Sequence, residues 1–133
     1  RLASSPIYRG QRMELTIKVL SAQVTRVGWA TEHSREVGTT EQSYGFGGFG
    51  KKSHNAQFED YGTRFGYNDK VTSVLDRSGQ AEIVYFRVNG VTCDESPAFT
   101  IPDTLDGPLF FAVCGRPGFK VKIVNKLSML PLE

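Results

Sequence analysis

The run of glycines and aromatic residues from Tyr44 to Asn55 constrains this chain more than any other segment. Gly45, Gly47 and Gly50 have the spacing G-x-G-x-x-G, and the lysines after them resemble the end of a phosphate-binding loop. Such loops bind phosphate when a helix follows at once, because its free N–H groups and its dipole hold the anion. The residues after this run show no apolar repeat at helical spacing. The segment therefore argues against a nucleotide site, and no cofactor is expected.

The same run fits an all-β protein. Its rings, Tyr44, Phe46 and Phe49, alternate with glycines. This pattern is typical of a chain that crosses closely over other backbone and places rings in pockets. We therefore interpret the segment as an aromatic-glycine loop.

Short apolar segments with a two-residue period cover much of the remaining chain. Strands are expected at residues 13–20, 24–30, 70–76, 81–88, 91–93, 109–114 and 119–124. Asn89-Gly90 is the strongest turn signal, and Gly115 to Gly118 resembles a hairpin loop between the last two strands. The turn after residue 76 predicts another hairpin. Strands with such short connections bury their apolar faces by stacking two antiparallel sheets, which predicts an all-β sandwich.

Length and composition predict one domain over residues 1–133. With 133 residues, of which 39% are hydrophobic, the chain can bury one core and is short for two. No apolar segment approaches the roughly 20 residues that cross a bilayer, and no signal peptide is visible. We expect an intracellular protein without membrane contact, in the nucleus or the cytoplasm. Because no initiator Met is present, we also expect an excerpt from a longer protein.

Catalytic and metal-binding groups have little support in the sequence. Cys114 stands in an apolar run and is expected to be buried, whereas Cys93 follows a turn and is expected to be exposed. No disulfide is expected, because nothing marks the chain as secreted. Neither His33 nor His54 stands at metal-ligand spacing from a cysteine, and no serine lies in a nucleophile motif. We interpret the chain as a non-enzymatic binding module.

Four motifs in a fixed order carry a resemblance to a known family. They are Arg26-Val-Gly-Trp-Ala30, the Gly-Phe-Gly-Gly-Phe-Gly-Lys-Lys-Ser run, Asn68-Asp-Lys-Val71 leading to Leu75-Asp76, and Phe86-Arg-Val-Asn-Gly90. From about Gly10 to Asn125 the chain is similar to a SPRY domain. The glycine run most resembles the branch of that family found in heterogeneous nuclear ribonucleoprotein U and in a DEAD-box helicase with an inserted SPRY domain.

The resemblance implies a bent sandwich of two antiparallel sheets, a concanavalin-like jelly roll, with ligand-binding loops at one end. It also implies that residues 13–20 and 24–30 form a hairpin. Independently of the resemblance, we expect Trp29 to be buried between the sheets. Two segments depart from the family pattern. They are Arg12-Met-Glu-Leu15, where the family places aromatic residues before Glu-Val, and Asn125-Lys-Leu127, where it often has Asn-Phe-Gly.

Cations and rings gather around the aromatic-glycine run. The candidate partner-binding residues are Tyr44, Phe49, Lys51, Lys52, His54, Tyr61, Arg64 and Arg116. The resemblance implies that end loops recognise a protein segment, within a protein of RNA metabolism. Aromatic rings between cations can also stack bases while the cations meet phosphates, so direct RNA binding around Lys51 and Lys52 is the alternative.

Two further interpretations stay open. The two lysines can be a solvated loop tip while the rings belong to the core. A sugar-binding sandwich is disfavoured, because no acidic metal-binding cluster accompanies the strands. The net charge of +2 is well below the strongly basic balance expected of a dedicated nucleic-acid-binding domain.

Overall fold

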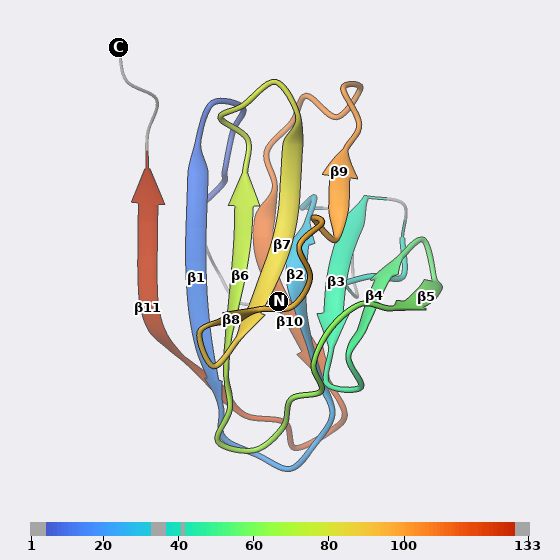
Figure 1. The fold of residues 1–133 in the computed structure, drawn as a ribbon, viewed down its shortest axis with the longest axis vertical. Helices are drawn as coiled ribbons and strands as arrows, with labels where there is room; N and C mark the ends of the chain where they lie inside the picture. Colours follow the sequence, from blue (N-terminus) through green and yellow to red (C-terminus); the bar gives the residue numbers. More distant parts are fainter. Residues whose placement is uncertain (1–4, 33–36, 41, 130–133) are drawn as a thin grey trace.

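The computed structural model describes residues 5–32, 37–40 and 42–129 of the chain. These residues form eleven strands and no helix (Figure 1). The strands are β1 (Arg12–Val19), β2 (Thr25–Ala30), β3 (Ser43–Gly47), β4 (Lys51–His54), β5 (Gln57–Asp60), β6 (Lys70–Asp76), β7 (Glu82–Val88), β8 (Val91–Thr92), β9 (Phe99–Ile101), β10 (Phe110–Gly115) and β11 (Val121–Met129). The expected all-β architecture is confirmed.

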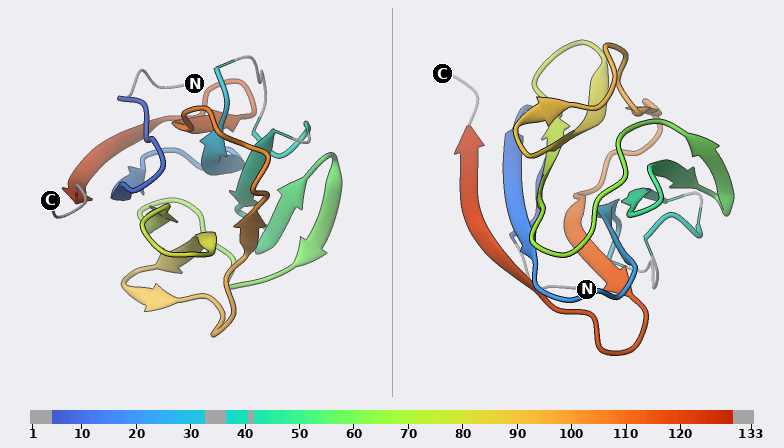
Figure 2. Two further views of the ribbon diagram at one scale, coloured as in Figure 1. Left: turned by 90° about the horizontal axis from the view of Figure 1, so that it is seen from above. Right: turned by 60° about the horizontal axis from the view of Figure 1, so that its bottom comes forward.

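The strands form two antiparallel sheets that stack as the layers of a sandwich (Figures 1 and 2). One sheet has the strand order β11-β1-β6-β7-β8, and β9 also pairs with β7. The second sheet has the order β10-β2-β3-β4-β5. Strands β11 and β5 therefore form outer edges of the two sheets.

The two-residue period of the strands builds the core between the layers. Every second residue of β1 is buried, and these residues are Met13, Leu15, Ile17 and Val19. In the other sheet, the ring of Trp29 lies edge-on to that of Phe111, with 5.5 Å between their centroids. Trp29 is 1% exposed, which confirms its expected place in the core.

Two of the expected hairpins are instead connections between the sheets. β1 pairs with β11 and β2 pairs with β10, so the chain changes sheet between β1 and β2 and again between β10 and β11. The two connections lie side by side, because the N–H of Leu20 donates to the carbonyl of Lys120 at 2.7 Å. The hairpin predictions are wrong here, since a short connection can turn within one sheet or cross the roughly 10 Å between two sheets.

The remaining hairpin predictions are confirmed. β6 pairs with β7 from Val71 opposite Val88 to Asp76 opposite Ile83. β7 continues into β8 through Asn89-Gly90, whose φ angles are 51° and 83°. Two consecutive positive φ angles are what the tight turn of a two-residue hairpin requires.

The aromatic-glycine run forms two strands and a turn rather than one loop. Tyr44 and Phe46 belong to β3, and β4 begins directly after Gly50. Gly50 has a φ of 82°, and a Cβ at this position would lie 2.4 Å from the carbonyl oxygen of Gly62. Only glycine fits this turn. The loop interpretation is corrected because pairing with β2 and β5 overrides the low strand propensity of the glycines.

A buried arginine joins three segments at the end of the sandwich opposite the sheet-crossing connections. Arg77 is 2% exposed, and its guanidinium donates to the carbonyls of Ile7 at 2.8 Å, Gly107 at 2.9 Å and Leu105 at 3.0 Å. Its Nε lies 2.6 Å from a carboxylate oxygen of Glu82. The sequence placed Arg77 in a turn and gave no sign that its side chain is buried. This residue holds the N-terminal segment and the β9–β10 connection against the sheets.

We predict that Arg77→Met lowers the free energy of unfolding by about 3 kcal/mol, because the buried carbonyls and carboxylate lose their donor. Urea unfolding followed by circular dichroism measures this change. Arg9→Met is the matched control, because Arg9 also pairs with Glu82, at 3.0 Å, but its side chain is 41% exposed. The control should cost less than about 1 kcal/mol. Equal losses in the two variants would contradict the structural role of Arg77.

Candidate interaction surface

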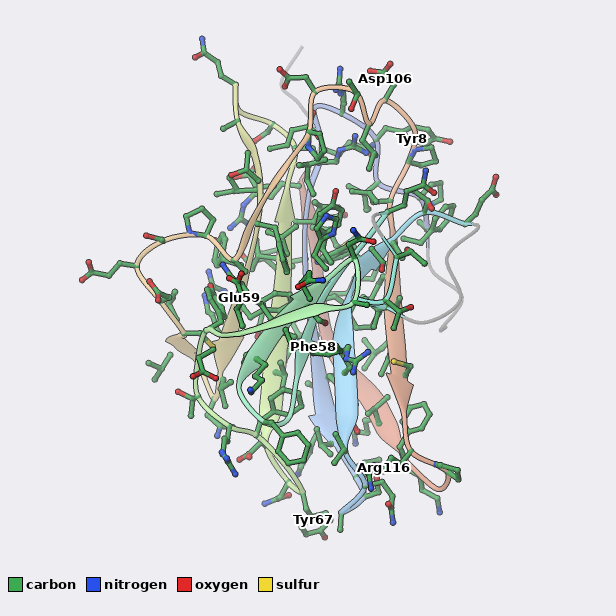
Figure 3. All side chains as sticks on the ribbon, turned by 90° about the vertical axis from the view of Figure 1, so that its right-hand side faces the viewer. Tyr8, Phe58, Glu59, Tyr67, Asp106 and Arg116 are labelled. Carbon is green, nitrogen blue, oxygen red and sulfur yellow. The ribbon has the colours of Figure 1, made fainter. Side chains whose placement is uncertain are left out.

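A groove of about 270 Å³ opens on the outer face of the β10-β2-β3-β4-β5 sheet. It lies where the β3–β4 turn and the β4–β5 hairpin meet the start of the β10–β11 connection. Figure 3 views this side of the molecule, with Phe58 near the middle and Arg116 toward the lower end. The residues that give the groove its chemistry are Arg26, Gly47, Phe49, Lys51, Phe58 and Arg116.

Exposed rings and guanidinium groups line the groove together. The rings of Phe49 and Phe58 are 54% and 49% exposed. The guanidinium of Arg26 lies 5.0 Å from the ring centroid of Phe58, and that of Arg64 lies 5.8 Å from the ring centroid of Phe49. These are cation–π distances. The surface therefore offers apolar contact and positive charge at the same place.

The groove carries an excess of positive charge. The Nη1 of Arg26 donates to the carbonyl of Val37 at 3.0 Å, and Lys51 lies 3.7 Å from a carboxylate oxygen of Asp60. Because the Asp60 side chain is 95% exposed, this ion pair is weak and readily exchanged. Among the described residues, Arg26, Arg64 and Arg116 have no carboxylate within ion-pairing distance.

The structure separates the two lysines that the sequence placed in one basic loop. Lys51 lines the groove, whereas the Nζ of Lys52 donates to the carbonyl of Ala98 at 3.1 Å on the opposite face of β4. A carboxylate oxygen of Glu59 lies 3.8 Å from the same Nζ. The prediction of a shared loop tip is wrong because both residues belong to a strand, whose successive side chains point to opposite faces.

His54 and Tyr61 lie on the Lys52 side of β4. The imidazole of His54 stacks on the ring of Tyr44, with centroids 4.6 Å apart, and its Nδ1 is 2.9 Å from the carbonyl oxygen of Ser43. The ammonium group of Lys52 is 5.7 Å from the ring centroid of Tyr61. These candidates therefore share a face that is separate from the groove.

Tyr44 is a correction to the predicted site. It lies opposite Trp29 in the β2–β3 pairing, on the inner face of the sheet, and is only 2% exposed. A residue buried between the layers cannot contact a partner while the domain is folded. The structure thus brings Phe49, Lys51, Arg64 and Arg116 together and leaves Tyr44 in the core.

Two residues that line the groove, Arg26 and Phe58, were not predicted from the sequence as site residues. Arg26 was interpreted as part of the family motif and as a buried hydrogen-bonding residue, although its place between buried Thr25 and Val27 directs it outward. Phe58 gave one usable signal, since it is a large apolar residue within a polar run. Its partner in the β4–β5 pairing is Ser53, and no sequence pattern predicted that pairing.

Neither thiol has the environment expected of it, because Cys93 and Cys114 are both of intermediate burial. Cys114 pairs with Arg26 across β10 and β2, so it faces the groove rather than the core. Cys93 is half-buried and packs against the core cluster, and this burial raises the pKa of its thiol. The expectations are corrected because strand alternation, and not local hydrophobicity, sets the direction of each side chain. Both cysteines are free.

Among the described residues, no group of three or more His, Cys, Asp and Glu side chains is placed to hold a metal ion. His33 lies outside the described residues. No helix in the described part of the chain is long and apolar enough to cross a membrane.

Fold and sequence together define a two-layered β-sandwich domain with a groove on one sheet. The family model of the SPRY domain matches residues 13–127, and this chain belongs to that family. SPRY domains are typically protein-interaction modules. The resemblance inferred from the four motifs is confirmed.

Its relatives include proteins of RNA metabolism. The chain is 43% identical over 90 residues to ATP-dependent RNA helicase DDX1 of Xenopus laevis, covering 67% of this chain and 12% of the relative. It is 42% identical over 87 residues to ATP-dependent RNA helicase Ddx1 of Drosophila melanogaster, covering 65% and 11%. It is 41% identical over 66 residues to heterogeneous nuclear ribonucleoprotein U-like protein 2 of Homo sapiens, covering 49% and 9%. The matched region thus spans roughly a tenth of these relatives.

The opposite directions of Lys51 and Lys52 predict different effects of reversing their charges. Lys51→Glu should change the free energy of unfolding by less than about 0.5 kcal/mol, because Lys51 is exposed. Lys52→Glu should cost about 1 to 3 kcal/mol, because it replaces the donor to Ala98 with a carboxylate beside Glu59. Thermal unfolding of the two variants measures the difference, and equal midpoints would contradict the assignment of the lysines to separate faces.

Tyr61 predicts a loss of stability at alkaline pH. Burial, with the nearby Cys93 and Asp94, raises the pKa of its hydroxyl from 10.0 to about 12. Because the folded state holds this proton more tightly than the unfolded chain, the stabilisation is complete below pH 10 and is lost as pH rises toward about 12. The free energy of unfolding should therefore fall more steeply over this range in the parent protein than in Tyr61→Phe. Identical pH profiles would count against the burial of the hydroxyl.

Proposed function

We propose that this domain is a non-catalytic interaction module that binds an extended segment of a partner protein in the groove beside Phe58. The observation that carries the proposal is the convergence of Phe49, Phe58, Arg26 and Arg116 on one concavity. Buried aromatic and arginine anchors dominate the energy of most protein interfaces. Here Phe49, Phe58 and Arg116 are exposed, and the strands β2 and β5 hold Arg26 and Phe58 in place.

The floor of the groove supports an extended ligand. A Cβ built on Gly47 would meet its nearest atoms, on Arg26 and Thr25, only at 3.9 Å, so the glycine leaves room there that a side chain would otherwise occupy. Such space lets a ligand's side chain or backbone lie close to the sheet. Lys51 and Arg116 stand where rim charges would guide an encounter, an effect that acts mainly on the association rate.

The relatives suggest the setting in which the module works. Two of them are named as ATP-dependent RNA helicases and one as a heterogeneous nuclear ribonucleoprotein U-like protein. We propose that this domain belongs to an intracellular protein of RNA metabolism and connects it to a protein partner. Any helicase activity would reside outside this domain.

RNA is a second candidate ligand for the same groove. The specific observation in its favour is the exposed ring of Phe49 beside the guanidinium of Arg64, in a groove that Lys51 also lines, because a base can stack on such a ring while cations meet phosphates. Lys52 cannot take part in this arrangement, because it lies on the opposite face of β4. We favour the protein ligand of the two, because the chain belongs to the SPRY family, whose domains are typically protein-interaction modules.

A peptide-display selection on the isolated domain tests the proposal. Peptides from a random library should bind the parent domain, and Phe58→Ala should weaken that binding by roughly thirtyfold, the effect of losing an aromatic anchor. Gly47→Leu should also weaken it by filling the groove. Fluorescence polarisation with the selected peptides measures each affinity.

Two variants serve as controls in this experiment. Gly66→Ala adds a methyl group at a position with no neighbour within 4 Å, and Lys52→Gln alters the far side of β4. Both should bind the peptides as the parent does. If the groove variants bind normally while Lys52→Gln does not, the ligand occupies the other face and the proposal is wrong. Oligonucleotide binding that is lost in Phe49→Ala would favour the RNA alternative.

A further inference from the structure

Three lysines lie in one line across the outer face of the β11-β1-β6 sheet. In the pairing register, Lys18 of β1 stands opposite Lys122 of β11 on one side and opposite Lys70 of β6 on the other. Residues directly opposite in an antiparallel pair project from the same face, about 5 Å apart. Because Ile17 and Val19 are buried, Lys18 projects outward, and its two partners project with it. We refer to these three residues as the lysine row.

The lysine row has no ion pair among the described residues. Other cations on this sheet face are neutralised, since Arg12 and Arg87 lie 2.6 and 2.7 Å from the carboxylate of Glu14. Asp69 is the nearest acidic residue in sequence to the row, and its side chain accepts hydrogen bonds from the N–H of Gly66 and the amide of Asn89. The row is thus a local concentration of positive charge in a domain with a net charge of only +2.

Like charges directly opposite each other destabilise a sheet. An anion with closely spaced charges that lies across the strands would offset this repulsion between the lysines. Next to the lysines, Thr16 stands opposite Asn125, which adds a neutral hydroxyl and an amide to this face, while the hydroxyl of Thr16 also lies 2.7 Å from that of buried Thr72. Lysine, threonine and asparagine side chains of this kind are the usual contacts to phosphate oxygens.

We propose that the lysine row binds the phosphodiester backbone of a nucleic-acid strand without reading its bases. The surface supplies no ring on which a base can stack, because the exposed rings of the described residues, Tyr8, Phe49, Phe58 and Tyr67, lie outside these strands. Among the described residues, the exposed large apolar side chains of these three strands are confined to Ile123, Val124 and Leu127 of β11, and β1 and β6 expose none beside the lysines. This site is separate from the groove, which lies on the other sheet.

Fluorescence anisotropy with single-stranded oligouridylate and oligocytidylate at several salt concentrations tests the proposal. The parent domain should bind both strands alike. The triple variant Lys18→Gln, Lys70→Gln, Lys122→Gln should lower the slope of log affinity against log salt by about two units, because each of the three lost phosphate contacts contributes roughly 0.7 to that slope. It should also raise the melting temperature, because it removes two repulsive cross-strand pairs.

The matched control removes the same charge at positions outside both the lysine row and the groove, as Arg9→Gln, Lys52→Gln, Lys126→Gln. It should keep most of the parent slope and gain no stability. An equal loss of slope in both triple variants would mean that only net charge matters, and would overturn the proposal. So would a preference for one base, no binding by the parent domain, or equally tight binding of the parent to polyglutamate or to phosphatidylserine vesicles.

Discussion

The two-residue period of the β-strand is the constraint on which the rest of this structure depends. It places the alternate apolar residues of β1 between the sheets and leaves Lys18 outside with its neighbours in register. It also sends Lys51 and Lys52 to opposite faces of β4, although they are adjacent in the chain. One geometric rule therefore defines the core, divides the candidate site and aligns a row of charge.

The sandwich keeps structural and interaction chemistry at different places. At one end, buried Arg77 satisfies carbonyls of the N-terminal segment and of the β9–β10 connection. Toward the other end, the sheet-crossing connections leave short loops, and Arg116 in one of them borders the groove. A domain held firmly at one end can display exposed rings and guanidinium groups near the other without depending on them for stability.

Several predictions failed for one shared physical reason. The sequence around Cys114 is apolar, yet its thiol faces the groove beside Arg26, and Tyr44 in a glycine-rich segment is core. In each case local composition suggested a direction that the pairing partner reversed. The same holds for the sheet-crossing connections, because the segment from Ser21 to Gln23 suits a turn within one sheet as well as a crossing between two.

The sequence by itself determined the family, the all-β class, the core position of Trp29 and the turn at Asn89-Gly90, because each rests on local pattern or motif order. The tertiary structure alone decided which strands pair, and hence that Phe58 meets Arg26 and that Lys18 stands between Lys70 and Lys122. Register joins residues far apart in the chain, and its energy comes from the packing of whole sheets rather than from any short segment. For that reason the groove and the lysine row became visible only in the folded chain.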